Sequence, residues 1–164
     1  MQTKDASPSL TRLFSELVDG AVRPGGAFVL NTGDIGLLRS LDKLSAADAS
    51  RSTNGGATIA AHAEHVRYGL SLMNRWADEG GDPFADATWD AAWKLSAVGD
   101  AQWQEIRDGL RGETGRWLRV LESGREASGV EFTGMVASIV HLAYHLGAIR
   151  QIHKDARGPA EGTF

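Results

Sequence analysis

Two histidines four residues apart, His141 and His145, are the residues of this chain whose type and spacing most directly indicate chemistry. They lie in a stretch, residues 132–149, that contains no Asp, Glu, Lys or Arg. On a helix this spacing places both imidazoles on one face with their Cβ atoms about 5–6 Å apart, so that they can bind one metal ion. An unpartnered polar ring is costly in apolar surroundings. The two side chains therefore either bind a metal or are satisfied by hydrogen bonds in the core.

A second pair, His62 and His65, lies in another segment with a helical pattern and offers candidates for a third ligand. Three imidazole nitrogens from two helices leave coordination positions open, as in catalytic rather than structural metal sites. Neutral imidazole suits Zn, Ni, Fe or Cu. We therefore expect a site made of His65, His141 and His145. His62 is a fourth ligand, a base outside the ligand shell or a helix-capping residue, and we favour the last two because a fourth ligand would close the site.

The composition narrows the class of protein. A chain of 164 residues predicts one domain, residues 1–164, with its own core. Its net charge of −4 argues against nucleic-acid binding, because no basic stripe is available to displace counterions from phosphates. There is no cysteine, so any sulfur chemistry would have to arrive with a cofactor or substrate. The first eight residues contain no apolar signal core, which favours a cytoplasmic protein.

The apolar stretch 132–149 has nearly the length of a membrane span. Thr133, Ser138, Tyr144 and the two histidines weaken that interpretation, and no second span exists in the sequence. We expect a soluble protein in which this helix is buried by its neighbours or shared with a second copy of the chain, as in a homodimer.

Hydrophobic residues recur at helical spacing in five segments, and no segment alternates with the period of a strand. The first expected helix carries its apolar residues at 10–18, begins at Ser7-Pro8 or Ser9 and ends at Gly20. The other expected helical segments are a piece with leucines at 37–44 that Asn31 to Asp34 would cap, 58–79 capped by Thr58, 100–122 capped by Asp100, and 133–154. Residues 83–99 have no clear period and predict a long connection that crosses the protein. The pattern predicts an all-α four-helix bundle with a crossover. The tail from Gly158 to Phe164 is expected to fray.

Other polar and aromatic residues have simpler explanations. Helix capping accounts for Asn31 and Asp34, and His153 near a helix end would complement the helix dipole. Tyr144 is either a proton donor to a substrate or, more commonly for such a residue, a packing side chain. Two pairs of tryptophans are each expected to act mainly in packing: Trp103 and Trp117 in the core, and Trp89 and Trp93 as contacts that hold the connection rather than as a substrate cage.

Thr58, Ile59 and His65, followed by the run His141-Leu142-Ala143-Tyr144-His145-Leu146-Gly147, resemble the DinB-like (YfiT-like) superfamily. The resemblance covers nearly the whole chain. In that family one histidine from the second bundle helix and a histidine pair from the last helix hold a divalent metal, commonly zinc or nickel. The positions that match these ligands are His65, His141 and His145. Many members have Trp eight positions before the first ligand, and Ala57 stands at that place here. The choice of His65 rather than His62 as the first ligand therefore depends on the other residues that match the family.

The resemblance implies a divalent-metal-dependent enzyme similar to thiol S-transferases and isomerases, which use a low-molecular-weight thiol and a small-molecule substrate. A metal with an open position lowers the pKa of such a thiol and presents a nucleophile. The alternative is a non-catalytic, metal-stabilised dimeric bundle that acts as a stress-response or binding module. The sequence leaves open the metal, the thiol, the electrophile and the catalytic acid or base.

Overall fold

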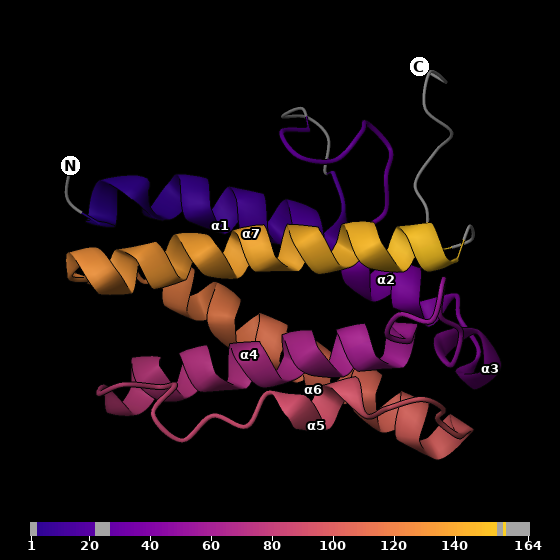
Figure 1. Cartoon of the computed structure of the whole chain (residues 1–164). Coiled ribbons are helices and arrows are strands. Elements are labelled where there is room, and N and C mark those ends of the chain that lie inside the picture. The colour runs from indigo at the N-terminus through magenta and orange to yellow at the C-terminus, as the bar shows by residue number, and fades with distance from the viewer. Residues whose placement is uncertain (1–2, 22–26, 154–155, 157–164) are drawn as a thin grey trace.

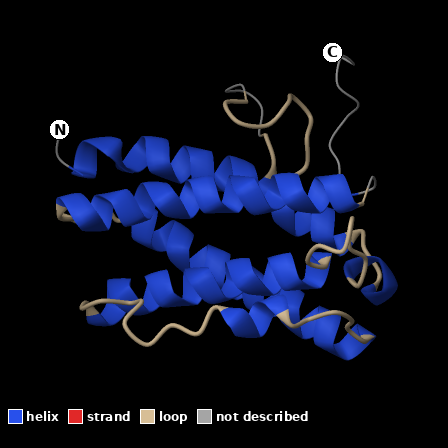
Figure 2. Ribbon diagram, in the orientation of Figure 1, coloured by secondary structure: helices blue, strands red, loops and turns tan. Residues whose placement is uncertain are grey.

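The computed structural model describes residues 3–21, 27–153 and 156 of the chain. These residues form seven helices and no strand, with one isolated backbone bridge between Gly20 and Ile35 (Figure 2). The prediction of an all-α protein is thus confirmed over the described part of the chain. The expected fraying of the tail concerns residues outside it.

Four helices are long: α1 (Thr3–Asp19), α4 (Ile59–Glu79), α6 (Asp100–Glu122) and α7 (Gly129–Ile152). Helix α7 packs against α1 and α4, and α6 packs against the same two helices (Figure 1). Three short helices lie in the connections: α2 (Leu37–Asp42), α3 (Ala46–Ala49) and α5 (Asp90–Trp93). The core between the long helices includes Phe14, Trp103 and Trp117, all at most 2% exposed. The two tryptophans therefore have the core role expected of them.

Helix α4 runs antiparallel to α7 and parallel to α6. Its N-terminal His62 contacts His145 near the end of α7, whereas its C-terminal Trp76 donates a hydrogen bond to Glu131 at the start of α7. The connection 80–99, which includes α5, returns along α4 before α6 begins (Figure 1). It therefore places α5 directly beside α4.

Both ends of α4 are encoded locally, as the sequence predicts. The Thr58 hydroxyl accepts a hydrogen bond from the backbone N–H of Ala61, which would otherwise have no partner in the first turn. Gly80 ends the helix with a φ of 75°, a conformation that costs other residues more than glycine. This helix positions His62 and His65 in its first two turns.

Helix α7 begins at Gly129, four residues before the predicted start at Thr133. Ser128 and Glu131 form a reciprocal capping box at its N-terminus, each side chain accepting from the other residue's backbone N–H. By length and composition α7 is apolar enough to cross a membrane, which core helices of soluble proteins also are. Its inner face, with Met135, Ile139 and Leu142, is buried in the core.

The outer face of α7 remains apolar without being covered. Val136, Val140 and Tyr144, spaced four residues apart, are 38%, 62% and 69% exposed. The position of Tyr144 on an apolar helix predicts a packing side chain, and this prediction is wrong. Tyr144 is exposed because it lies on the side of α7 that faces away from the other long helices.

One other predicted helix start is wrong. Helix α1 begins at Thr3 rather than near Ser7 to Ser9, because Ala6 and Ser7 are buried and Ser7 donates to the carbonyl of Leu121 in α6. Helices α2 and α6 begin at Leu37 and Asp100, as the pattern predicts, but the residue at the N-cap of α6 is Gly99 and not the predicted Asp100.

The predicted caps at the second helical piece are also wrong. Asp34 does not cap α2; its carboxylate is buried and accepts a hydrogen bond from Arg150 of α7 at 2.8 Å. The backbone N–H of Asn31 donates to the same carboxylate. A buried carboxylate requires a cationic partner, and that requirement outweighs the local capping preference.

Candidate metal centre

The structure brings His65, His141 and His145 together, as the sequence predicts. Ligand nitrogens of the three rings lie within 4.8 Å of one another. The Nε2 atom of His141 is 3.1 Å from Nε2 of His65 and 2.9 Å from Nε2 of His145. The two antiparallel helices thus direct three ring nitrogens at one point, with one histidine from α4 and two from α7.

His62 lies on the other side of His145. Its Nδ1 atom is 2.8 Å from Nδ1 of His145, so His145 contacts His62 through one ring nitrogen and His141 through the other. This geometry favours a role for His62 outside the ligand shell. It does not cap α4, since the cap is made by Thr58.

Burial keeps these rings neutral. His65 and His145 are only 8% and 2% exposed. Desolvation, reinforced by the neighbouring histidines, lowers the pKa of His65 to about 4 and that of His145 to about 3. Desolvation also lowers the pKa of His62 and of His141. At neutral pH all four rings therefore offer lone pairs rather than positive charges, which is the state that metal binding requires.

Hydrogen bonding alone satisfies this cluster poorly. The Nε2 atom of His141 faces two imidazole nitrogens, yet a neutral imidazole nitrogen either donates one hydrogen bond or accepts one along its single lone pair. Nδ1 of His65 is also buried without a hydrogen-bond partner among the described residues, whichever group its Nε2 contacts. The alternative of core histidines satisfied by one another thus leaves at least one of the facing Nε2 atoms unpaired in apolar surroundings, at a cost of about 1–3 kcal/mol.

A divalent ion fits the same arrangement. Two ligands at about 2.0–2.1 Å from a zinc ion lie about 2.8–3.4 Å apart for angles between 90° and the tetrahedral value. The two close nitrogen pairs, at 2.9 and 3.1 Å, fall in this range. His141 is therefore spaced from both His65 and His145 as one ligand is from another on the same ion, and the third nitrogen pair lies within 4.8 Å.

Two tryptophans from the crossover cover the histidines. The ring of Trp93 in α5 lies 4.3 Å from that of His65 at an interplanar angle of 30°, and it also contacts His62 and His145. The ring of Trp89 is 5.3 Å from that of His65. The two side chains do hold the connection against the bundle, but the surface they contact is the histidine cluster itself. Sequence patterns missed this because the crossover has no period from which its path could be read.

The remaining candidate residues divide between the edge of the site and distant positions. Tyr144 meets the ring of His145 edge-on at 5.0 Å, on the exposed side of α7. His153 lies at the C-terminal end of α7, as expected, but it is buried, and its Nε2 atom is 3.1 Å from an oxygen of Asp48. Asn31 and Asp34 belong to the contact with Arg150 described above and not to the site.

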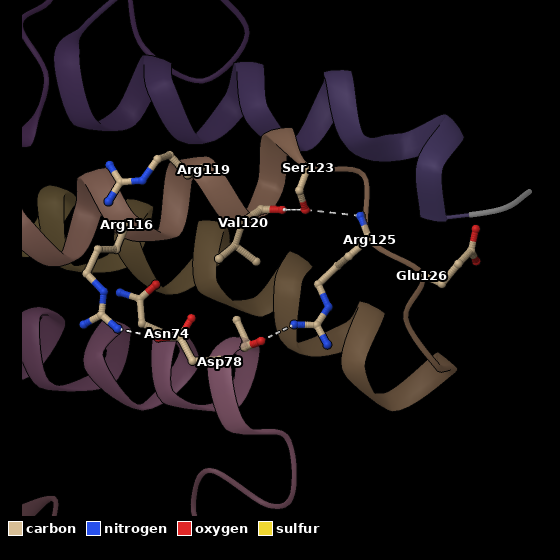
Figure 3. Close-up of a pocket in the computed structure, with 9 residues that line it drawn as sticks. Asn74, Asp78, Arg116, Arg119, Val120, Ser123, Arg125 and Glu126 are labelled. Atoms are coloured by element: carbon tan, nitrogen blue, oxygen red, sulfur yellow. Dashed lines mark hydrogen bonds and ion pairs between the residues drawn. The ribbon is translucent and has the colours of Figure 1, made fainter.

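Three cavities are lined by described residues of α4. One of about 430 Å³ opens beside His65 and His141. A second, about 540 Å³, lies between α4, α5 and the start of α6. The third, about 570 Å³, lies near the C-terminal end of α4, where Asn74, Asp78 and Arg116 line it (Figure 3). Arg116 is paired there with Asp78 at 2.7 Å. Of the three, the first is the one that His65 and His141 line, and roughly 20 Å of helix separates His65 from Asp78.

Comparison with known proteins gave no match: neither a family model, nor a curated protein, nor a solved structure matches this chain.

Proposed function

We propose that this protein is a divalent-metal-dependent enzyme that resembles the DinB-like thiol S-transferases and isomerases, built as a four-helix bundle with a crossover. His65, His141 and His145 are its metal ligands, and zinc or nickel is the expected ion. The observation that carries the proposal is the convergence of three neutral, largely buried imidazoles beside a cavity. When bound, the ion supplies a Lewis acid whose open positions lower the pKa of a thiol or water.

In this proposal the residues around the ligands orient them, shield them from water and leave space for a substrate. The Nδ1 atoms of His145 and His62 are 2.8 Å apart. With Nε2 of His145 as a metal ligand, Nδ1 of His145 would carry the proton and donate to His62, which would fix the tautomer of His145. Trp93 shields the face of His65 from water. The cavity beside His141 provides room for a small-molecule substrate. Because the chain has no cysteine, the nucleophilic sulfur belongs to a low-molecular-weight thiol.

The outer face of α7 supports a second candidate function. Val136, Val140 and Tyr144 form an exposed apolar stripe, as expected of a surface that a second copy of the chain covers. A metal-stabilised dimeric binding module without catalysis would use the same histidines and the same stripe. It differs from the enzyme in one respect, since its metal raises stability without supporting turnover.

The test begins with metal analysis of untagged protein, because an expression tag can itself introduce nickel. Conjugation of glutathione, mycothiol and bacillithiol to a panel of electrophiles is then measured with wild type and with His145→Ala. His153→Ala is the matched control, since it also removes a buried histidine but lies outside the site. The proposal requires metal and turnover in wild type and in the control, and neither in His145→Ala. Metal with no turnover above the metal-free rate supports the binding module instead.

A further inference from the structure

The cavity beside the histidines is lined almost entirely by apolar groups. It lies between α4 and α7, and Phe84 and Trp89 of the connection form part of its lining. Val66, Leu70 and Met73 of α4 form one wall. Its volume of about 430 Å³ lies within the range of about 300–1,000 Å³ that is typical of small-molecule sites.

No charged side chain lines this cavity among the residues that the structure describes. Its one hydroxyl, that of Ser138, already donates to the carbonyl of Met135 and accepts from the indole N–H of Trp117. A charged group that entered the cavity would lose its hydration and find no partner of opposite charge. The lining therefore selects against the carboxylates of peptide-like thiols and in favour of uncharged molecules.

Two glycines line the cavity, so it is wider there by the volume of a side chain. A Cβ atom at Gly69 would be in ordinary contact with the ring of Trp89 at 3.7 Å and with Cε1 of His141 at 3.8 Å. A Cβ atom at Gly134 would lie 3.4 Å from the methyl group of Met73. The cavity thus leads to the edge of His141, and a molecule inside it can present one end to the metal centre.

Aromatic rings form the outer wall. The rings of Phe84 and Trp89 are 5.9 Å apart with an interplanar angle of 32°, and Trp89 also contacts Tyr68 edge-on. Such rings contribute most to the free energy of binding when they pack against a flat apolar or aromatic part of the ligand. We propose that this cavity binds the body of an uncharged, apolar substrate, preferably aromatic, with its reactive end at His141 and His65. The catalytic part of this inference rests on the proposed function, whereas the binding part does not.

The test is equilibrium binding of the neutral fluorescent probe N-phenyl-1-naphthylamine to the full chain. Ala137→Trp fills the cavity from its rim on α7, where Ala137 lines it and is exposed, so the fold should tolerate the larger ring. The matched control is Val130→Trp, a substitution on the same helix at a residue that is 84% exposed and belongs neither to the cavity nor to the apolar stripe. We expect saturable binding to wild type and to the control, and at least tenfold weaker binding to Ala137→Trp.

A second probe tests the selection against charge. The anionic analogue 8-anilino-1-naphthalenesulfonate should bind wild type at least tenfold more weakly than the neutral probe. Equal affinity for the two probes, no saturable binding of the neutral one, or equal losses in both tryptophan variants would overturn the proposal. Circular dichroism of each variant checks that it has kept its helices.

Repeating the titration after treatment with a chelator separates this inference from the proposed function. Probe binding that survives chelation, together with an absence of metal or turnover, rejects the enzyme but keeps the apolar site. Metal-dependent turnover without probe binding keeps the enzyme and rejects the apolar site.

Discussion

Replacing His62 and His65 one at a time tests most sharply how the histidine cluster is organised. Both residues lie on α4 and both contact histidines of α7, but only His65 directs its nitrogen at the pair of Nε2 atoms. His65→Ala should therefore remove a ligand. His62→Ala should remove only the hydrogen bond that orients His145.

The two substitutions should reduce the affinity for zinc by different factors. Zinc sites with four ligands bind with about 10–16 kcal/mol, or about 2.5–4 kcal/mol per ligand, so loss of His65 should raise the dissociation constant about 100- to 1,000-fold. Loss of an outer hydrogen bond to a metal-binding histidine costs about 10- to 100-fold. We therefore expect His65→Ala to bind zinc about tenfold more weakly than His62→Ala.

The assay is titration of chelator-treated, untagged protein with Zn²⁺ in competition with a chromophoric chelator at pH 7.5. Visible absorption of the Co²⁺ form reports on the ligand set, and His62→Ala should keep the wild-type spectrum. The reverse order of affinities would mean that His62 is the ligand and that the assignment on α4 is wrong by one turn. Full occupancy in a variant that lacks both His141 and His145 would refute the metal site altogether.

Three further predictions follow from particular contacts. In metal-free protein the free energy of unfolding should fall by about 2 kcal/mol between pH 7.5 and 5 through His145 alone. Its pKa is about 3 in the folded chain and near 6.5 when unfolded, so the unfolded chain takes up the proton first. In thermal melts, the stability of His145→Gln should depend less on pH than the stability of wild type. An equal dependence in the two proteins would contradict the lowered pKa of His145. Val140→Glu should convert a homodimer into monomers in light scattering, whereas a monomeric wild type at micromolar concentration rejects the dimer. Gly36→Ala should destabilise the fold by about 3 kcal/mol in denaturant titration, because its Cβ would lie 2.3 Å from the carbonyl oxygen of Val18; Gly99→Ala, with open space around it, should change little.

The sequence predicted those parts of the fold that depend on neighbouring residues. Thr58 and Gly80 delimit α4 correctly because a cap needs only a few residues of chain. The start of α7 was missed although Ser128 and Glu131 carry the capping-box spacing, a signal that a stricter search for such boxes would have found. The start of α1 has no such signal, since it depends on burial of Ala6 against the rest of the protein.

The same distinction applies to the site. The pair His141 and His145 was predictable because helical spacing alone places both rings on one face. His65 required the pairing of α4 with α7, which the resemblance supplied. Trp93 was not predictable as a cover for the cluster, because it lies on a four-residue helix in an aperiodic connection. Tertiary packing, not local propensity, determines where such a segment runs.

The order of the helices along the chain has a consequence for biosynthesis. His65 precedes its contact His141 by 76 residues, and α7 follows all the other long helices. At about 5–20 residues per second, the ribosome adds those 76 residues in several seconds, during which α4 and α6 can pair while the site lacks two of its three nitrogens. A nascent chain that stops before α7 therefore lacks two of the three clustered histidines. Under the proposed function, loading with an ion belongs to the last stage of maturation, after the final helix has left the ribosome.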